Sequence, residues 1–559
     1  MQQKVDVLVA GSGASGLTAA LAAAASGARV LLIERAASLG GTSALSGGRV
    51  WIPANHLPQN ADDSQAAARS YLSALIPRRY AHLSEAFIAN APDMARFVEE
   101  NTPHRFVCCA AYPDYHPDLP GATLGGRCLD MLPIDLSALT PIARLVRTPP
   151  GFLPMTHAEW ERWRYPVRFD WPLLRRRERD GIRTNGVALV AALIDGAVTA
   201  GVSVITEARL TDVTLDGNGA VDGATVTQGG AGIPVAAKAV IMATGGFDWD
   251  EGLRASWLPG PQRATGAPPG NTGDALRIAT RLGAPTDNLA EGWWMPMLSI
   301  PGEEVDGAPC YRSLIRERSV PRQIMVNATG ARFVNEASPY NDVGKAMHAR
   351  AAGEYPNDPA YMIFDEGFRR RYPLPGIAPG GEPPAWVARA TSPRELATAI
   401  GIDPDGLEQT ISRWNDACAN GCDPDFGRGA SPYDRYGGDP WAGQNPNLGP
   451  LTDPPYYAVR VLAGTIGTKG GPVTDASAVV RKQNGGPIPG LYAVGNAAAF
   501  WTGDAYPGPG ATLGIGMTMG YLAGKHASSR RHDGLLPAQF WKGQAFESPW
   551  SEPQMPRVS

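Results

Sequence analysis

The sequence predicts an α/β protein in which a Rossmann-like nucleotide-binding domain carries an inserted α+β domain. Three observations lead to this prediction: a strand, glycine turn and helix at the N-terminus, a mid-chain strand that ends in Ala-Thr-Gly-Gly, and an aromatic, proline-rich segment before the sheet pattern returns. At 559 residues the chain exceeds the ~250–300 residues at which a single core stops growing, so more than one domain is expected.

The first fifty residues carry the clearest motif. Residues 4–10 have the pattern of a buried parallel strand, and Gly11-Ser12-Gly13-Ala14-Ser15-Gly16 follows directly. An alanine-rich helix over residues 17–26, a strand over 29–33 and an acidic residue, Glu34, complete a βαβ dinucleotide-binding fingerprint.

The residues of this fingerprint have separate physical roles. Gly11 permits the tight turn, Gly13 lets the backbone approach a pyrophosphate, and Gly16 allows the helix to pack closely on the strand. The helix N-terminus offers amide donors and the positive end of a dipole to the phosphates. Glu34 is placed to accept hydrogen bonds from a ribose hydroxyl.

The stretch after Glu34 and Arg35 favours FAD over a nicotinamide cofactor. Residues 39–48 are rich in glycine and hydroxyl side chains, and such a stretch supplies backbone amides that can surround a pyrophosphate and a flavin. A nicotinamide-binding fold would normally begin its next helix here. Because no other glycine-rich turn has the same strand and helix around it, a second, NAD(P)H-binding domain is not predicted.

Later elements continue the α/β pattern. They are a helical region over residues 62–102, a helix over 186–200, a strand over 202–206, a hairpin through 210–226, a strand over 235–243, a helix over 275–282, a strand over 490–495 and a helix over 515–528. The last helix follows a glycine-rich turn, and its N-terminus is expected to face the pyrimidine edge of the flavin, where negative charge collects on reduction.

The predicted cofactor site gathers residues at the ends of these elements. The strand ending in Ala243-Thr244-Gly245-Gly246 marks the second half of a two-part FAD fold, and Gly495-Asn496 ends the strand that resumes the sheet. The residues expected to contact FAD are Gly11, Gly13, Ala14, Ser15, Gly16, Glu34, Arg35, Gly41, Thr42, Ser43, Ser46, Gly47, Gly48, Ala208, Ala243, Thr244, Gly245, Asp274, Gly495, Asn496, Thr512 and Leu513.

These patterns predict a chain divided into a Rossmann-like FAD-binding domain and an inserted α+β catalytic domain that caps the substrate. The FAD-binding domain is expected over residues 1–287 and 449–528, the catalytic domain over 288–448 and a C-terminal tail over 529–559.

Composition excludes several classes of function. A net charge of −4 with 19% charged residues leaves no basic surface for nucleic acid. No apolar run reaches the ~18 residues of a membrane span, and the first strand begins too early for a signal peptide, so a cytoplasmic location is expected. Six scattered cysteines indicate neither a disulfide framework nor a metal site. Without a Cys-x-x-Cys-His haem motif, electrons are expected to leave to a partner protein or a diffusible acceptor such as a quinone.

These motifs together resemble the flavoproteins related to fumarate reductase and succinate dehydrogenase. The shared marks are the N-terminal fingerprint, the Ala243–Gly246 and Thr272–Asp274 turns, the stretch Asn327-x-x-Gly-x-Arg-Phe-x-Asn-Glu336 and the strand over 490–495. This resemblance covers most of residues 4–528. It supports the fold and FAD but does not determine the substrate.

Narrower motifs are similar to those of the 3-ketosteroid dehydrogenases, especially the Δ1 type. They are Ser46–Asn55, Asp114-Tyr115-His116-Pro117, Pro339-Tyr340 and the turn over residues 506–514. Fumarate reductases carry histidine and arginine around the last motif to bind carboxylates. Tyr506 and Thr512 stand in that region here, so a dicarboxylate substrate is not favoured. Tyr506 is followed by proline, where the family is expected to have alanine.

The resemblance implies a mechanism for 1,2-dehydrogenation of a 3-ketosteroid. The Tyr506 hydroxyl and the Gly510 amide would bind the 3-keto oxygen, Tyr340 would remove the carbon 2 proton, and a hydride would pass from carbon 1 to flavin N5. The Tyr115 hydroxyl would assist the ionisation of Tyr340. Tyr112 lies only three residues earlier and is the alternative candidate for this supporting role. Ionising a tyrosine of ordinary pKa at pH 7 costs about 4 kcal/mol, so we expect neighbouring groups to lower the pKa of Tyr340 and the rate to rise toward pH 9.

Three alternatives remain. A related flavoenzyme would act at another ring position, as a Δ4-ketosteroid dehydrogenase does, or would run in reverse as an ene reductase on another enone. A flavin-binding subunit without catalytic activity of its own would need no tyrosine constellation.

Overall fold

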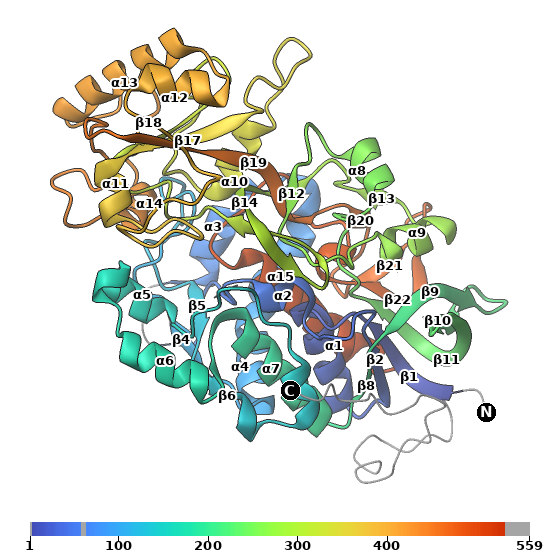
Figure 1. The fold of residues 1–559 in the computed structure, drawn as a ribbon. Helices are drawn as coiled ribbons and strands as arrows, with labels where there is room; N and C mark the ends of the chain where they lie inside the picture. Colours follow the sequence, from blue (N-terminus) through green and yellow to red (C-terminus); the bar gives the residue numbers. More distant parts are fainter. Residues whose placement is uncertain (1–2, 58–62, 531–559) are drawn as a thin grey trace.

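Two β-sheets dominate the fold (Figure 1). Among the described residues, one has 8 strands and the other has 7. The computed structural model describes residues 3–57 and 63–530. The predicted tail at 529–559 therefore lies almost entirely outside the described residues. The predicted α/β fold class is confirmed.

The first sheet is the nucleotide-binding sheet. Its strands run in the order β21 (Val479–Arg481), β22 (Pro487–Ala493), β11 (Ala231–Met242), β1 (Gln3–Ala10), β2 (Val30–Ile33) and β8 (Ser203–Ile205). In addition, β10 (Val221–Gln228) pairs with β11, and β9 (Ala208–Leu215) pairs with β10. The five strands from β22 to β8 are mutually parallel, whereas β9 and β10 pair antiparallel. The predicted strands and hairpin are present with boundaries shifted by a few residues.

Alternate residues of β1 point to opposite faces of this sheet, and each face is covered. Val7 and Val9 pack in the core that also holds α1 (Ala14–Ala25), α7 (Asn185–Thr199) and α15 (Ala511–Ala527). Leu8 and Ala10 pack on the other side with residues of β9, β10 and α9 (Asp274–Arg281). Burial on both faces explains why these strands are almost wholly apolar.

Helices α1 and α15 pack closely because both carry small residues where they meet. A Cβ at Gly516 would lie 2.4 Å from the Ser15 Oγ, and one at Gly520 would lie 2.3 Å from the Ser15 carbonyl oxygen. A Cβ at Gly524 would lie 2.2 Å from the Ala19 carbonyl oxygen. This close packing holds the N-terminus of α15 beside the N-terminus of α1.

The second sheet is almost entirely antiparallel. Its strands run in the order β15 (Ala308–Ser313), β14 (Gly292–Val305), β19 (Tyr456–Thr468), β17 (Ala360–Asp365) and β16 (Gln323–Val326), with β12 (Ala264–Thr265) and β18 (Ala388–Ala390) attached to β19. Its central strand, β19, follows residue 448, so the sheet extends beyond the boundary predicted for the inserted domain. The domain division itself stays a prediction.

The remaining elements surround these sheets. Short strands form three small sheets: β3 (Val50–Trp51) with β5 (Cys128–Met131) and β4 (Phe106–Cys108), β6 (Ile134–Asp135) with β7 (Ile182–Arg183), and β13 (Thr286–Asp287) with β20 (Gly471–Pro472). The other α-helices are α2 (Gly41–Leu45), α3 (Gln65–Leu75), α4 (Ala81–Asn101), α5 (His157–Trp163), α6 (Trp171–Arg179), α8 (Glu251–Trp257), α10 (Tyr340–Met347), α11 (Glu366–Arg371), α12 (Pro393–Ile400), α13 (Pro404–Ala419) and α14 (Pro432–Gly437).

Within residues 3–57 and 63–530, no helix is both long and apolar enough to cross a membrane. No group of histidine, cysteine, aspartate or glutamate side chains in the same ranges is arranged to hold a metal ion.

Candidate active site

A cavity of about 1730 Å³ lies where the two sheets meet. Its lining includes Gly11, Glu34 and Ala243, which directly follow the parallel strands β1, β2 and β11, and it also includes Met295 of β14 and Ile466 of β19. Ligands of α/β sheets bind outside the carboxyl ends of the strands, and this cavity has that position. One end is lined mainly by glycine and hydroxyl residues, and the other mainly by tyrosines.

The turn after β1 has almost no room for side chains. Gly11 has φ +111°, and a Cβ there would lie 2.2 Å from the carbonyl oxygen of Ala243 on the neighbouring strand. A Cβ at Gly16 would lie 2.1 Å from the carbonyl oxygen of Gly11. Gly16 does not line the cavity; it lies where helix α1 packs on the turn.

Other glycines leave space that the protein itself does not use. A Cβ at Gly13 would meet nothing closer than the Ser43 Oγ at 3.6 Å, and one at Gly41 nothing closer than 4.0 Å. The buried Thr244 hydroxyl has no hydrogen-bond partner among the described residues. An open cradle beside an unpartnered hydroxyl fits a bound phosphate-containing cofactor such as FAD.

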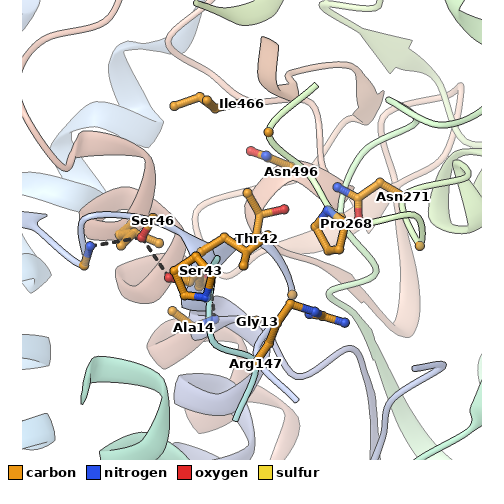
Figure 2. Close-up of a pocket in the computed structure, with 18 of the residues that line it drawn as sticks. Gly13, Ala14, Thr42, Ser43, Ser46, Arg147, Pro268, Asn271, Ile466 and Asn496 are labelled. Atoms are coloured by element: carbon orange, nitrogen blue, oxygen red, sulfur yellow. Dashed lines mark hydrogen bonds between the residues drawn. The ribbon is translucent and has the colours of Figure 1, made fainter. Parts of the chain in front are cut away.

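Figure 2 shows how α1 and α2 are joined at this end. The Ala14 amide donates to the Ser43 Oγ at 3.0 Å, and the Ser46 hydroxyl donates to the Ser43 carbonyl oxygen at 2.8 Å. The Ala14 amide, at the start of the helix predicted to face the phosphates, is thus already bonded to protein. Ser43 holds the glycine-rich segment against the start of α1.

Two acidic residues predicted to face the cofactor are bonded to protein groups. The Glu34 carboxylate accepts from the Ser12 amide at 3.0 Å, the Ser12 hydroxyl at 2.6 Å and the Ala36 amide at 3.0 Å. Asp274 forms an ion pair with Arg209 at 2.6 Å. Both acids still line the cavity, so each can also accept from a bound ligand.

The cavity lining contains all of the predicted cofactor residues except Gly16. These are Gly11, Gly13, Ala14, Ser15, Glu34, Arg35, Gly41, Thr42, Ser43, Ser46, Gly47, Gly48, Ala208, Ala243, Thr244, Gly245, Asp274, Gly495, Asn496, Thr512 and Leu513.

Three tyrosines from distant parts of the chain meet at the other end. The Tyr340 and Tyr506 hydroxyl oxygens are 2.8 Å apart, and the Tyr115 ring packs edge-on to both, with centroid distances of 5.6 Å and 5.0 Å. All three side chains are buried and line the cavity. The neighbouring Tyr112 instead stacks on His157 at 4.8 Å and on Tyr436 at 4.7 Å.

Hydrogen bonding leaves the Tyr506 proton available to a ligand. The Tyr506 oxygen accepts from the Tyr340 hydroxyl at 2.8 Å and from the Thr512 hydroxyl at 3.1 Å. These two bonds use both lone pairs of a hydroxyl oxygen, so its own O–H must donate elsewhere. Thr512, predicted as a cofactor contact, thus also orients Tyr506.

Burial raises the pKa of Tyr340 well above its ordinary value, and the nearby Tyr506 hydroxyl adds to the rise. Interaction with the Tyr115 hydroxyl lowers this pKa but does not outweigh burial. The expected net lowering of the Tyr340 pKa is therefore wrong for the protein alone, because removing a phenolate from water costs more than one hydroxyl contact returns.

Gly510 lies at the N-terminus of α15 with φ +90°. A Cβ at this position would lie 2.4 Å from the Arg49 carbonyl oxygen. The Gly510 carbonyl oxygen accepts from the Trp51 amide at 3.1 Å, whereas its own amide has no acceptor among the described residues. Gly510 lines the cavity at the positive end of a 17-residue helix, and its amide is free to donate to a ligand oxygen.

The sequence did not indicate a buried lysine that supports this end of the site. The Lys469 ammonium nitrogen donates to the carbonyl oxygens of Gly503 and Ala505 at 2.8 Å and 2.9 Å and lies 3.8 Å from the Trp293 ring centroid. Burial lowers the pKa of Lys469 to about 7. Its contacts fix the segment that leads into Tyr506, and no short motif around Lys469 could have predicted them.

Two arginines, Arg49 and Arg316, also line the tyrosine end. Arg49 belongs to the Ser46–Asn55 motif, and the motif by itself predicts no role for its arginine. Arg316 lies in an irregular segment after β15.

Comparison with known proteins places this geometry in a family. The sequence pattern of the FAD binding domain family matches residues 6–513. The chain is 42% identical to 4-oxocyclohexanecarboxylate 2-dehydrogenase of Sinomonas cyclohexanicum over 93% of this chain and 92% of the relative. It is 34% identical to 3-oxosteroid 1-dehydrogenase of Mycobacterium tuberculosis over 94% and 99%.

A solved structure agrees with these relatives. The crystal structure of 3-ketosteroid Δ1-dehydrogenase from Sterolibacterium denitrificans, in complex with 1,4-androstadiene-3,17-dione, matches with a TM-score of 0.88 and 35% identity. The match covers 94% of this chain and 100% of that chain.

Proposed function

The chain belongs to the FAD binding domain family, and from this premise we propose that it removes two hydrogens from neighbouring carbons beside the carbonyl of a ring ketone. The membership confirms the predicted cofactor, FAD. When bound, FAD supplies the acceptor for the hydride that leaves the substrate. The residues at the tyrosine end of the cavity supply the rest of the chemistry.

One observation carries this proposal: the Tyr506 hydroxyl accepts from both Tyr340 and Thr512, so its proton is available to a ketone. The Gly510 amide is a second free donor in the same cavity. Two donors directed at a carbonyl oxygen stabilise the enolate that forms when the adjacent carbon loses a proton, and each is worth roughly 10²–10³ in rate.

We assign the removal of that proton to Tyr340. Its hydroxyl lies 2.8 Å from the Tyr506 oxygen, so a ketone bound to Tyr506 has its α-carbon close to Tyr340. The Tyr115 ring packs edge-on against both tyrosines. Interaction with the Tyr115 hydroxyl also favours the ionised form of Tyr340.

Two substrate classes have support. Similarity in shape to a 3-ketosteroid Δ1-dehydrogenase supports 1,2-dehydrogenation of a 3-ketosteroid. The 42% identity to 4-oxocyclohexanecarboxylate 2-dehydrogenase supports a single-ring keto acid. Both reactions use the same α-proton removal and differ only in what the rest of the cavity must hold.

The test is anaerobic addition of a ketone to the purified yellow protein. We would add androst-4-ene-3,17-dione and 4-oxocyclohexanecarboxylate separately, follow the visible flavin band and identify the product. Bleaching with a new double bond beside the ketone supports the proposal, and a double bond at another position indicates the Δ4-type alternative. If neither ketone bleaches the flavin, the result contradicts the proposal. It would instead favour an ene reductase or a flavin-binding subunit without catalytic activity of its own.

We also propose that a diffusible acceptor such as a quinone reoxidises the flavin, since the sequence has no haem attachment motif. The expected result is rapid return of the yellow colour when a soluble quinone is mixed with the reduced enzyme. Reoxidation no faster than in buffer alone contradicts this assignment.

A further inference from the structure

Two positively charged side chains at the tyrosine end of the cavity are not used by the proposed chemistry. Arg49 lies just before β3, and Arg316 lies in the segment after β15. Both are partly buried and both line the cavity. Neither lies within ion-pair distance of an acidic side chain of residues 3–57 and 63–530, although the Asp130 carboxylate acts electrostatically on Arg49.

One neutral histidine, His157, contacts both guanidinium groups through the same ring nitrogen. The Nδ1 atom of His157 accepts from the Arg49 Nε at 3.2 Å and lies 3.0 Å from an Arg316 Nη. Its Nε2 lies 2.6 Å from the Tyr436 hydroxyl, which donates to Glu161 at 2.5 Å. Burial and the two arginines hold the pKa of His157 well below its ordinary value, so the imidazole stays neutral.

This arrangement leaves guanidinium donors unused. The Arg49 Nη1 donates to the Gly47 carbonyl oxygen at 2.9 Å. This carbonyl and the one available nitrogen lone pair of His157 cannot satisfy two guanidinium groups, each of which has five N–H donors. The Nε and Nη1 atoms of Arg316 have no acceptor among the described residues, and its guanidinium carbon lies 3.1 Å from the Trp160 ring centroid. Arg316 lines the cavity, so these donors are available to a ligand there.

Tyr112 lines the cavity together with the two arginines and the reacting tyrosines. Tyr112 interacts electrostatically with Arg49 and Arg316, and also with Tyr340 and Tyr506. Arg49 and Arg316 line the same cavity as Tyr506, so a ring ketone held by Tyr506 shares this cavity with both guanidinium groups.

The arginines are also tied to the catalytic segment. The Arg318 Nη1 donates to the Ser338 carbonyl oxygen at 2.6 Å, two residues before Tyr340. The segment that carries Arg316 is thereby held at a constant position relative to the base. A subsite on this segment would therefore stay at a constant distance from the residues that bind the ketone.

We infer that Arg49 and Arg316 form an anion subsite for a carboxylate carried by the ring ketone at the end remote from its carbonyl. The inference rests on the proposed function and narrows its substrate to the keto acids. Two guanidinium groups without an ion-pair partner match a carboxylate, because each oxygen can accept charge-assisted hydrogen bonds from the fork of donors. A neutral steroid ring would leave both cations facing apolar carbon, which is unfavourable.

The competing explanation is that the arginines only brace Trp160, His157 and Tyr112. If the arginines had only this structural role, losing one would affect charged and neutral substrates equally. An anion subsite matters only for the charged ones, so a matched pair of ligands separates the two explanations.

The first experiment measures binding and does not depend on turnover. Cyclohexanecarboxylate and the neutral cyclohexylmethanol would be titrated calorimetrically into the FAD-loaded enzyme and into its Arg316→Leu variant. We expect the wild-type enzyme to bind the acid at least ~30-fold more tightly than the alcohol, and the variant to lose this preference. Equal binding of the two ligands by the wild-type enzyme overturns the inference.

The second experiment compares 4-oxocyclohexanecarboxylate with its methyl ester as substrates. In Arg316→Leu we expect the KM for the acid to rise roughly 100-fold with kcat little changed, while kcat and KM for the ester stay within about twofold. Parallel losses for both substrates identify a structural brace and overturn the inference.

Arg164→Leu is the matched control. Arg164 also packs on Trp160, with its guanidinium carbon 4.5 Å from the ring centroid, but it does not line the cavity. Its loss should not change the ratio of acid to ester. If Arg316→Leu fails to fold, Arg316→Gln keeps the polarity and length needed for the same comparison. If no ketone reduces the flavin, the proposed function fails, while the binding experiment still decides the subsite.

Discussion

The two ends of the cavity recognise their ligands by different means. At the cofactor end, glycines such as Gly13 and Gly41 leave space beside the backbone, and Gly11, Glu34 and Ala243 each directly follow a parallel strand. At the tyrosine end, the groups are side chains, and Tyr115, Tyr340 and Tyr506 reach one another only through the tertiary fold. The difference teaches that a short sequence motif can specify a site built from backbone groups. A site built from side chains that are distant in the sequence depends on how whole elements pack.

The two ends should therefore respond differently to mutation. Adding a side chain at the cofactor end should expel the cofactor and leave the fold intact where space permits. Removing a single hydroxyl at the tyrosine end should abolish chemistry while the cofactor stays bound.

Tyr340→Phe should have the largest effect. Loss of the base should lower kcat by roughly 10²–10⁴-fold, while the protein stays yellow because the cofactor end is untouched. The measurement is single-turnover flavin bleaching together with FAD content. Tyr361→Phe, in the second sheet and away from the cavity, is the control and should be active; comparable bleaching in both variants would show that Tyr340 is not the base.

Gly13→Val tests the cofactor end. The new side chain would project into the open cradle, so we expect FAD affinity to fall by about 100-fold, or ~2.7 kcal/mol, with little loss of folded protein. FAD titration and circular dichroism would measure the two quantities. Gly232→Val, in the outer part of β11 and facing no cofactor, should retain FAD. A Gly13→Val enzyme that stays fully loaded would contradict a phosphate cradle at this turn.

The pH dependence follows from the burial of Tyr340. The reaction needs the ionised phenolate, and burial raises the pKa of this group well above its usual value. The reactive fraction should therefore grow tenfold per pH unit, and kcat/KM should rise from pH 6 to pH 9 without a plateau. The residual rate of Tyr340→Phe should be independent of pH. A flat profile for the wild-type enzyme would argue against a tyrosine base.

Lys469→Met should have the smallest effect. The Gly503 and Ala505 carbonyl oxygens would lose their donor, the segment before Tyr506 would loosen, and kcat should fall roughly tenfold with FAD still bound. Lys345→Met removes the exposed ion pair to Asp504 in the same segment, measured at 3.0 Å, and should change kcat little. Equal effects of the two variants would mean that the buried lysine has no special positioning role.

By itself, the sequence determined the fold class and the cofactor. The glycine turn after β1, the strand that ends at Ala243 and the helix after Gly510 depend on local backbone geometry, which neighbouring residues specify. Residue spacing within a motif is preserved on folding, so these features can be read before the structure is known.

Only the tertiary structure decided how the substrate end is built. Tyr340 and Tyr506 are 166 residues apart in the chain, and their contact depends on where α10, packed on β14 of the second sheet, meets the segment before α15. The same packing sets the burial that raises the pKa of Tyr340 and brings Arg49 beside Arg316. Desolvation and long-range contacts belong to the packed molecule, because no local pattern of residues encodes which distant side chains will exclude water together.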